Sequence, residues 1–203
     1  MIGVVDYGLG NVLAIINIYK RLEVPVCLVK SVSDFRLITH FIIPGVGSFD
    51  HALMRLNRSG MRLELSNAIN SGLPVLGICV GMQLMANSSE EGTLSGLGWI
   101  PGSVKRFDNN NSSSHFISVP HLGWNDIVAI DHPLFHGIDN ARFYFLHSYY
   151  FSPQYDHHVF AKTTNGISFA AAVGSHNCYG VQFHPEKSHQ YGIQLLRNFS
   201  LLR

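Results

Sequence analysis

The sequence predicts an α/β fold, with a mostly parallel sheet flanked by helices and a mixed or antiparallel extension in the second half. Two observations lead to this expectation. In the first half, short β-rich runs alternate with segments of helical periodicity, as parallel strands joined by helices do. In the second half, short strand-like runs follow one another with little helix between them. The 203 residues fit a single domain spanning 1–203.

Four strands are predicted in the first half, over residues 2–5, 26–29, 41–43 and 74–78. The last of them is apolar throughout, which indicates burial on both faces. Asn11 is a candidate cap for a helix that runs to about Leu22, because apolar residues recur there at helical spacing. A second helical segment covers roughly residues 51–71. This alternation implies right-handed crossovers within one parallel sheet.

The second half contains six further strand candidates, over residues 104–107, 127–129, 143–146, 159–163, 169–173 and 179–183. Residues 190–201 place apolar side chains at helical spacing and predict a closing helix. Residues 108–114 read DNNNSSS, a polar stretch of low complexity that we expect to be a flexible surface loop. We assign no function to Asn109–Ser114.

The composition argues against several classes of protein. Hydrophobic residues make up 46% of the chain and charged residues 13%, so we expect an ordered domain. The formal net charge is +1 and no Lys/Arg-rich run occurs, so no nucleic-acid partner is expected. The longest apolar stretch, residues 73–86, is short and interrupted by Pro74 and Gly77, which argues against a membrane span. The first residues do not resemble a signal peptide.

Cysteine and histidine usage argues against disulfides and metals. Cys27, Cys79 and Cys178 are odd in number and far apart. This pattern fits free thiols in a reducing cytoplasm better than a disulfide framework or a CxxC site. The pair His157-His158 is adjacent and lacks the i,i+4 spacing of helical metal ligands. We therefore expect a cytoplasmic protein that needs no metal and no cofactor.

The strongest chemical signal lies in Pro74-Val-Leu-Gly-Ile-Cys-Val-Gly-Met-Gln83. A buried strand ends just before Cys79, and Gly77 and Gly81 flank the cysteine two residues away on either side. This is the G-x-nucleophile-x-G pattern of a strand-to-helix elbow, whose tight turn leaves no room for neighbouring side chains. The elbow would expose the sulfur at the carboxyl edge of the sheet. A helix that follows would direct its positive end at the sulfur and favour the thiolate.

A second motif, Gly180-Val-Gln-Phe-His-Pro-Glu-Lys-Ser188, supplies a candidate base. A strand would deliver His184 at its end, because Pro185 cannot continue a ladder. Glu186 lies close enough to accept a hydrogen bond from one imidazole nitrogen, which leaves the other nitrogen for Cys79. An H-x-E pair alone is a weak signal, and a free cysteine is commonly a core residue. Together the two motifs predict a Cys-His-Glu triad, while the other two cysteines lack such neighbours and are interpreted as structural.

Over nearly its whole length, the chain resembles the class I (triad-type) glutamine amidotransferases. More closely, it resembles the glutaminase subunits of imidazole glycerol phosphate synthase. The elbow and the His-Pro-Glu motif carry the resemblance to the superfamily. The segments that complete the resemblance are Val5-Asp-Tyr-Gly-Leu-Gly-Asn11, Pro44-Gly-Val-Gly47, Ser89-Glu-Glu-Gly92, Gly96-Leu-Gly-Trp-Ile-Pro-Gly102, Pro120-His-Leu-Gly-Trp-Asn125 and Phe143-Tyr-Phe-Leu-His-Ser-Tyr149. Each segment alone would be an ordinary turn, cap or core segment, and their joint order argues for the family.

The resemblance implies a flavodoxin-like amidotransferase fold and a role for each motif. Cys79 would be the nucleophile, His184 the general base and acid, and Glu186 its orienter. The residues implied to hold glutamine are Gln83, Glu91, His147, Ser148 and Tyr149. The residues implied to form or gate the oxyanion hole through their backbone are Gly45, Val46, Gly47 and Val80.

The resemblance also implies a partner. Members of the subunit family form a heterodimer with a cyclase subunit of TIM-barrel fold and pass it ammonia for histidine biosynthesis. Trp124, Tyr144 and Lys187 match positions at that interface. The strand Pro44–Gly47 is implied to stay unproductive until the partner binds its own substrate. The implied activity is hydrolysis of glutamine to glutamate and ammonia within a lyase-type synthase.

Three alternatives stay open at this point. A paralogous subunit could feed ammonia to another synthase, for example one that amidates a surface-polysaccharide sugar. A cysteine peptidase such as a γ-glutamyl hydrolase is a second alternative, against which the interface-type motifs argue. A non-catalytic regulatory subunit is the third, and the intact triad argues against it. Val80 stands where leucine most often follows the cysteine, a conservative departure from the family.

Overall fold

The main sheet of the computed structural model, which describes residues 1–108 and 117–203, has eight strands in the order β2-β1-β3-β4-β13-β12-β11-β8. The first five strands are parallel: β2 (Val26–Val29), β1 (Ile2–Val5), β3 (His40–Gly45), β4 (Val75–Cys79) and β13 (Cys178–Val181). The last three continue the sheet antiparallel: β12 (Ile167–Ser175), β11 (Val159–Asn165) and β8 (Val128–Ala129). The predicted fold class, a mostly parallel sheet with an antiparallel extension, is confirmed.

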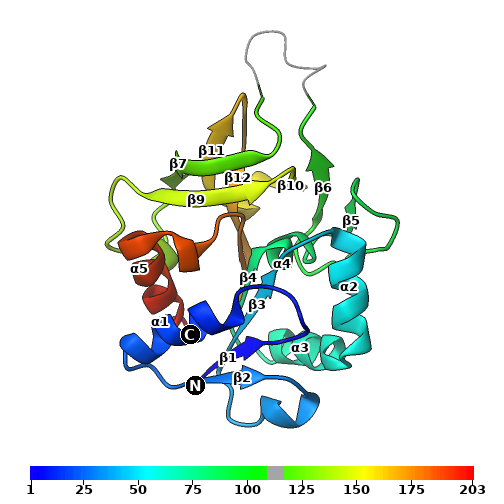
Figure 1. Ribbon diagram of the computed structural model, residues 1–203, viewed down its shortest axis with the longest axis vertical. Coiled ribbons are helices and arrows are strands. Elements are labelled where there is room, and N and C mark those ends of the chain that lie inside the picture. The colour runs from blue at the N-terminus through cyan, green and yellow to red at the C-terminus, as the bar shows by residue number, and fades with distance from the viewer. Residues whose placement is uncertain (109–116) are drawn as a thin grey trace.

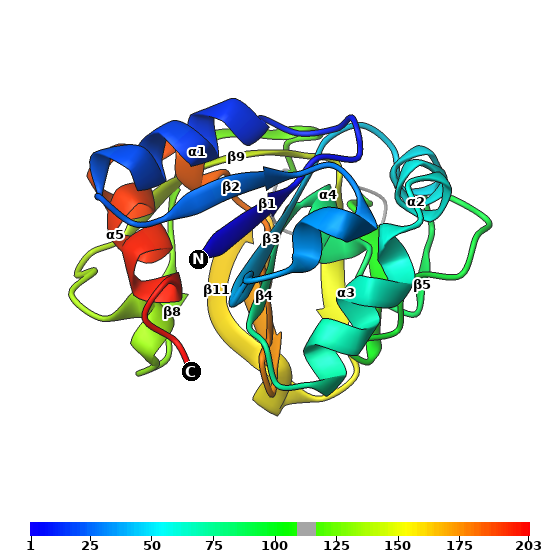
Figure 2. The ribbon, with the colours of Figure 1, turned by 90° about the horizontal axis from the view of Figure 1, so that it is seen from below.

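Helices cover both faces of the parallel part. Figures 1 and 2 show α1 (Val12–Arg21) and α5 (His189–Phe199) on one face, and α2 (Phe49–Arg58) and α3 (Met61–Asn70) on the other. Strands β1, β4 and β13 are buried along their whole length, because helices exclude water from both faces. The Tyr19 hydroxyl donates a hydrogen bond of 2.8 Å to the Leu196 carbonyl and joins α1 to α5.

Two smaller sheets lie beside the main one. The first has the order β10-β6-β5, from Tyr149–Pro153, Gly102–Arg106 and Ser88–Ser89. The second pairs β7 (His121–Asp126) with β9 (Arg142–His147). Figure 1 shows β7 and β9 crossing above the end of the molecule where β4 meets the short helix α4 (Val80–Gln83). A separate two-stranded sheet, β7 with β9, therefore covers the carboxyl end of the parallel strands.

The predicted helix over residues 51–71 is wrong as a single element. The segment contains two helices, α2 and α3, separated at Gly60. Gly60 has φ +74, a left-handed conformation that interrupts the helical hydrogen bonding. Ser59 and Gly60 instead cap α2, because their N–H groups donate to the carbonyls of Arg55 and Asn57.

Several strand predictions also need correction. Strands β7, β10 and the two-residue β5 were not predicted, and β3 continues past Ile43 through Pro44 and Gly45. Pro44 fits because proline lacks only a donor, and it still keeps register with Ile78 of β4. Helix α5 begins at His189 and ends at Phe199, earlier than predicted. The loop prediction for 109–114 lies outside the described residues.

The predicted strand over residues 179–183 corresponds to β13, which runs from Cys178 to Val181. Beyond it the chain changes hydrogen-bonding partner. The Gln182 N–H still donates to Ala171 of β12, but the His184 N–H donates to Tyr144 of β9. His184 is therefore held between the main sheet and the two-stranded sheet of β7 and β9. Within the described residues, no helix is long and apolar enough to cross a membrane.

Candidate active site

Cys79 is the last residue of β4 and adopts φ 55° and ψ −113°. A positive φ is strained for a residue with a Cβ and is found mainly at functional turns. The flanking glycines make the turn possible. A Cβ on Gly77 would lie 2.6 Å from the Gly81 carbonyl, and a Cβ on Gly81 would lie 1.9 Å from the Ile43 oxygen. The elbow predicted from the sequence is therefore present, and both glycines are required for it.

The helix predicted after the cysteine is present but short. Helix α4 spans only Val80–Gln83, a single turn. Four aligned peptide units sum to a small macrodipole, so the helix contributes less to a thiolate than a long helix would. Other groups must supply most of the stabilisation of a negative sulfur.

His184 and Glu186 form a buried pair. The His184 Nδ1 lies 3.0 Å from Glu186 Oε1, and both side chains are almost completely buried. A carboxylate oxygen only accepts, so Nδ1 carries the proton and Nε2 is directed away from Glu186. The second oxygen, Oε2, is buried without a hydrogen-bond partner. The pair therefore orients the imidazole as the sequence predicted.

The electrostatics of His184 favour its protonated form. Burial by itself lowers the pKa of His184, but hydrogen bonds with Cys79 and Glu186 and the attraction of their negative charges raise it to about 10. The imidazole therefore links the sulfur to the carboxylate. A protonated His184 beside Cys79 is the arrangement that an activated cysteine nucleophile needs.

Buried Ser188 fixes the turn that contains His184 and Glu186 through two hydrogen bonds. The Ser188 hydroxyl donates a hydrogen bond of 2.6 Å to the His184 carbonyl and accepts one of 3.0 Å from the Tyr144 N–H. Ser188 is fully buried. The turn η5 (Pro185–Lys187) is thus tied to strand β9 on one side. The sequence motif contained Ser188, but its clamping role was not predicted.

A cavity of about 660 Å³ opens beside the sulfur. It brings together all three residues of the predicted triad with all five residues predicted to hold glutamine. Three of the four predicted oxyanion residues, Val46, Gly47 and Val80, also line it. Gly45 does not; it lies in the ladder opposite Cys79, where a Cβ would press on the Gly81 nitrogen. Gly10, Asn11 and Pro120, which were not predicted as site residues, complete part of the wall.

Gln83 and Glu91, two polar residues of the cavity wall, make hydrogen bonds that limit which groups they can present to a ligand. Both N–H groups of Gln83 are used, at 3.0 Å to the Tyr149 carbonyl and 3.0 Å to Gln182 Oε1. Gln83 can therefore offer the cavity only its oxygen. Glu91 Oε2 accepts the Phe49 N–H at 2.8 Å and so caps helix α2. Asp50, a residue not predicted, accepts two backbone N–H groups of the loop after Glu91.

Two buried histidines adjoin the cavity: His147 lines it and His121 lies beyond His147. His147 Nδ1 lies 2.8 Å from the Tyr149 carbonyl, and its Nε2 lies 3.0 Å from His121 Nδ1. Burial lowers the pKa of His147 to about 3 and that of His121 to about 4. Both rings are therefore neutral, and each acts as one donor and one acceptor.

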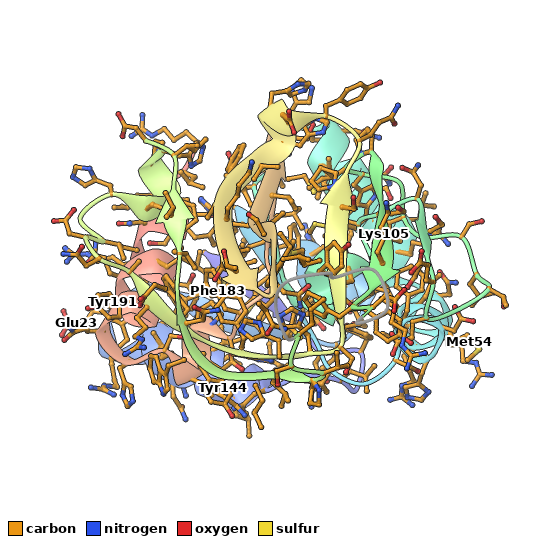
Figure 3. All side chains as sticks on the ribbon, turned by 90° about the horizontal axis from the view of Figure 1, so that it is seen from above. Glu23, Met54, Lys105, Tyr144, Phe183 and Tyr191 are labelled. Atoms are coloured by element: carbon orange, nitrogen blue, oxygen red, sulfur yellow. The ribbon has the colours of Figure 1, made fainter. Side chains whose placement is uncertain are left out.

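The predicted interface residues lie outside the cavity or at its edge. Leu122 and Trp124 of β7 stand opposite Leu146 and Tyr144 of β9 on the outer face of this sheet. The Trp124 ring meets the Tyr144 ring edge-on, with 6.2 Å between the ring centres, and stacks on the His189 ring, with 5.2 Å between the ring centres. Figure 3 shows Tyr144 at the outer side of the molecule and Phe183 in its interior. We refer to Leu122, Trp124, Tyr144 and Leu146 as the outer face.

The outer face adjoins the cavity. Lys187 lines the cavity and holds its ammonium 5.6 Å from the Tyr144 ring centre. Leu146 also lines the cavity, and its carbonyl lies 3.8 Å from the Cys79 sulfur. A molecule bound to this apolar surface would therefore lie next to the Cys79 sulfur.

An elbow cysteine, a buried His-Glu pair and an adjoining cavity on this fold are the arrangement expected of an amidotransferase with a cysteine nucleophile. Residues 3–202 match the family described as Glutamine amidotransferase class-I, and the chain belongs to that family. The structure of PurLQS from Thermotoga maritima superimposes with a TM-score of 0.74 at 21% identity, covering 98% of this chain and 97% of that one. At 21% identity, the similarity to this solved structure shows the fold alone.

Closer relatives define the subfamily. The imidazole glycerol phosphate synthase subunit HisH of Bdellovibrio bacteriovorus is 51% identical over 203 residues, 98% of this chain and 99% of that one. The subunit HisH of Leptospira interrogans is 49% identical over 205 residues and the full length of both chains. Within the class I family, the chain is therefore a glutaminase subunit of the imidazole glycerol phosphate synthase type, an enzyme of histidine biosynthesis.

Proposed function

We propose that Cys79, His184 and Glu186 form the triad that hydrolyses glutamine to glutamate and ammonia. One observation carries this assignment: the strained elbow presents Cys79 to a cavity that also contains His184, whose Nδ1 is occupied by Glu186. The cavity, at about 660 Å³, falls within the usual range of small-molecule sites.

The proposed reaction begins with attack of the Cys79 thiolate on the glutamine carboxamide carbon. Backbone N–H groups of Val46, Gly47 and Val80 would bind the oxyanion, and one such donor contributes about 3–4 kcal/mol in other acyl-transfer enzymes. His184 donates its Nε2 proton to the leaving amine, the C–N bond breaks and ammonia departs. His184 then takes a proton from the water that hydrolyses the γ-glutamyl thioester.

The substrate would be held by the polar wall of the cavity. Gln83 offers an acceptor oxygen, because its donors are taken. Glu91 provides a carboxylate toward the substrate ammonium, and residues 147–149 form the opposite wall. Gly45 would act indirectly, since its missing Cβ lets β3 approach the elbow.

We further propose that the outer face binds a cyclase subunit of TIM-barrel fold, in the cytoplasm, to form a heterodimer. Three observations support this site: Leu122, Trp124 and Leu146 expose 59%, 40% and 42% of their surface, the patch is contiguous across β7 and β9, and it adjoins the cavity. Aromatic anchors surrounded by aliphatic groups are typical of protein interfaces. Ammonia released beside such an interface can pass to the partner without contact with water.

The test is glutamate production from glutamine by the purified chain, alone and with the cyclase subunit plus its ribonucleotide substrate. We expect strong stimulation when both are present. Folded protein that is not stimulated would contradict the assignment of the partner. Cys79→Ala should remove glutaminase activity while retaining partner binding, and turnover above background in that variant would contradict the assignment of the nucleophile.

A further inference from the structure

Gln182 contacts the reacting sulfur from outside the cavity. It lies two residues before His184, its side chain is fully buried, and it does not line the cavity. Its Nε2 lies 3.7 Å from the Cys79 Sγ, within hydrogen-bonding range for sulfur. Its Oε1 accepts a hydrogen bond of 3.0 Å from Gln83 Nε2. The amide thus joins the cysteine to a residue of the elbow helix.

The orientation of this amide is fixed by its neighbours. The Tyr149 carbonyl can only accept, so Gln83 must present its nitrogen to it. The same Gln83 nitrogen faces Gln182, so Gln182 must present its oxygen there. The Gln182 N–H is left directed at the sulfur. Rotating the Gln83 amide by 180° would turn its oxygen toward two other oxygens, and rotating the Gln182 amide would bring two N–H donors together.

A chain of hydrogen bonds, buried at His121 and His147 and more exposed at Asn125, supports this arrangement. The Tyr149 carbonyl also accepts the His147 Nδ1–H, so His147 Nε2 is an acceptor for the His121 Nδ1–H. His121 Nε2 then accepts from Asn125, 3.1 Å away. The other N–H of Asn125 donates to the Thr164 carbonyl at 2.8 Å. Each N–H in the chain therefore has one permitted acceptor: donation runs from Asn125 through the two histidines to the Tyr149 carbonyl, and from Gln83 through Gln182 to the sulfur.

We propose that Gln182 is a further catalytic residue, whose Nε2–H hydrogen-bonds the Cys79 sulfur and stabilises its thiolate during the reaction. The single turn of α4 supplies little dipole. Among the described residues, the sulfur has two hydrogen-bonding partners besides Gln182: His184 and the Leu146 carbonyl, which is an acceptor. A thiolate cannot donate to that carbonyl. It can accept from Gln182, so the bond selects the reactive form of the sulfur. This inference rests on the proposed role of Cys79 as nucleophile.

The experiment compares Gln182→Met and Gln182→Glu with the parent chain, all carrying Cys27→Ser so that the partly exposed second thiol is absent. Methionine has similar length but no N–H, and glutamate keeps the shape while replacing the donor with an acceptor. The pH dependence of Cys79 alkylation by iodoacetamide and kcat/KM for glutamine, with the partner bound, are measured. Asn198→Ala, which removes another buried amide far from the sulfur, is the matched control.

We expect the midpoint of the alkylation profile to move to higher pH in both Gln182 variants, further in Gln182→Glu. We expect kcat/KM to fall about 10- to 100-fold, the range for one hydrogen bond to a charged group, with KM little changed. A residue that only filled space would lower thermal stability, as Asn198→Ala should, without moving the pH profile.

Folded variants with an alkylation profile and kcat/KM within twofold of the parent would overturn the proposal. If neither variant folds, the side-chain N–H resonance of Gln182 in the parent is followed by NMR. It should shift when Cys79 is alkylated, and a resonance that does not respond would also overturn the proposal. Failure here is distinguishable from failure of the proposed function, since in the second case Cys79→Ala would itself remain active.

Discussion

At the scale of single residues, the site contains histidines whose pKa values are shifted in opposite directions. His184 is held protonated by Cys79 and Glu186, whereas His121 and His147 are held neutral by burial. All three lie within one connected region, so burial alone does not decide the charge of a histidine here. The presence or absence of an anionic partner does.

The first prediction concerns the coupling of His184 to the cysteine. In Cys79→Ala, the hydrogen bond and the negative charge of the sulfur are lost, while Glu186 still raises the pKa of His184 and burial still lowers it. We expect the pKa to fall from about 10 toward 6.5, measured by NMR titration of the imidazole carbons. Cys27→Ala is the control and should leave the titration unchanged. A pKa that stays near 10 in Cys79→Ala would show that the sulfur is not its partner.

The second prediction concerns stability in acid. The pKa values of His147 and His121 are lowered from 6.5 to about 3 and 4, so the unfolded chain binds protons that the folded chain does not. Their contribution to the free energy of unfolding is present above pH 6.5 and is lost as the pH falls toward 4. His184 has the opposite sign: its contribution is present below pH 6.5 and is lost as the pH rises through about 10.

Urea unfolding of His121→Asn between pH 7 and pH 4 tests this. We expect a shallower loss of stability than in the parent, since one of the buried groups no longer takes up a proton. His51→Asn, at an exposed position, is the matched control. Equal slopes for the parent and His121→Asn would contradict the prediction.

At the scale of elements, the elbow depends on close approach between β3, β4 and α4. The third prediction is that Gly81→Ala lowers the free energy of unfolding by about 1–3 kcal/mol, because its Cβ would lie 1.9 Å from the Ile43 oxygen and the backbone must move. Glutaminase activity should fall with it, because the same movement displaces Cys79. Chemical denaturation measures the first effect and glutamate release the second.

The control for Gly81→Ala is Gly72→Asn. Gly72 is also glycine at a turn, with φ +84, but nothing lies within 4 Å of a Cβ built there, and asparagine tolerates this conformation. It should cost little stability and no activity. Equal stability of Gly81→Ala and the parent would show that the elbow is more adaptable than its contacts indicate.

The two-stranded sheet of β7 and β9 was the part of the fold that the sequence predicted least well. Strand β7 was not predicted, because Gly123 and Asn125 weaken its β propensity and its outward residues are apolar rather than polar. The same departure from alternation, with Leu122 and Trp124 outward, identifies the outer face once the strand is placed. Large exposed apolar patches on soluble proteins often mark interaction sites, which supports the proposed interface with the partner.

At the scale of the whole molecule, the fourth prediction concerns the partner. Trp124→Ala should weaken binding of the cyclase subunit by about 2 kcal/mol, roughly 30-fold, as expected for a central aromatic anchor. Partner-stimulated glutaminase activity should fall in parallel at subsaturating partner, while activity of the isolated chain is unchanged. Val128→Ala, an exposed apolar position on β8 at the edge of the main sheet, is the control. Equal affinities for the two variants, by calorimetry, would exclude the outer face as the interface.

The sequence by itself determined the fold class, the elbow and the pairing of His184 with Glu186. These depend on short-range patterns: apolar runs of strand length, two glycines around a cysteine, and a carboxylate two residues from a histidine. The predicted nucleophile, base, orienter and glutamine-binding residues all meet at one cavity, and their roles stay predictions until tested.

Only the tertiary structure decided which distant groups complete the site. Gln182 reaches the sulfur because β13 lies beside β4, and the chain from Asn125 to Gln182 joins strands that are far apart in the sequence. Hydrogen-bond direction and burial are properties of the assembled fold, because they depend on which groups exclude water and which remain to accept a proton.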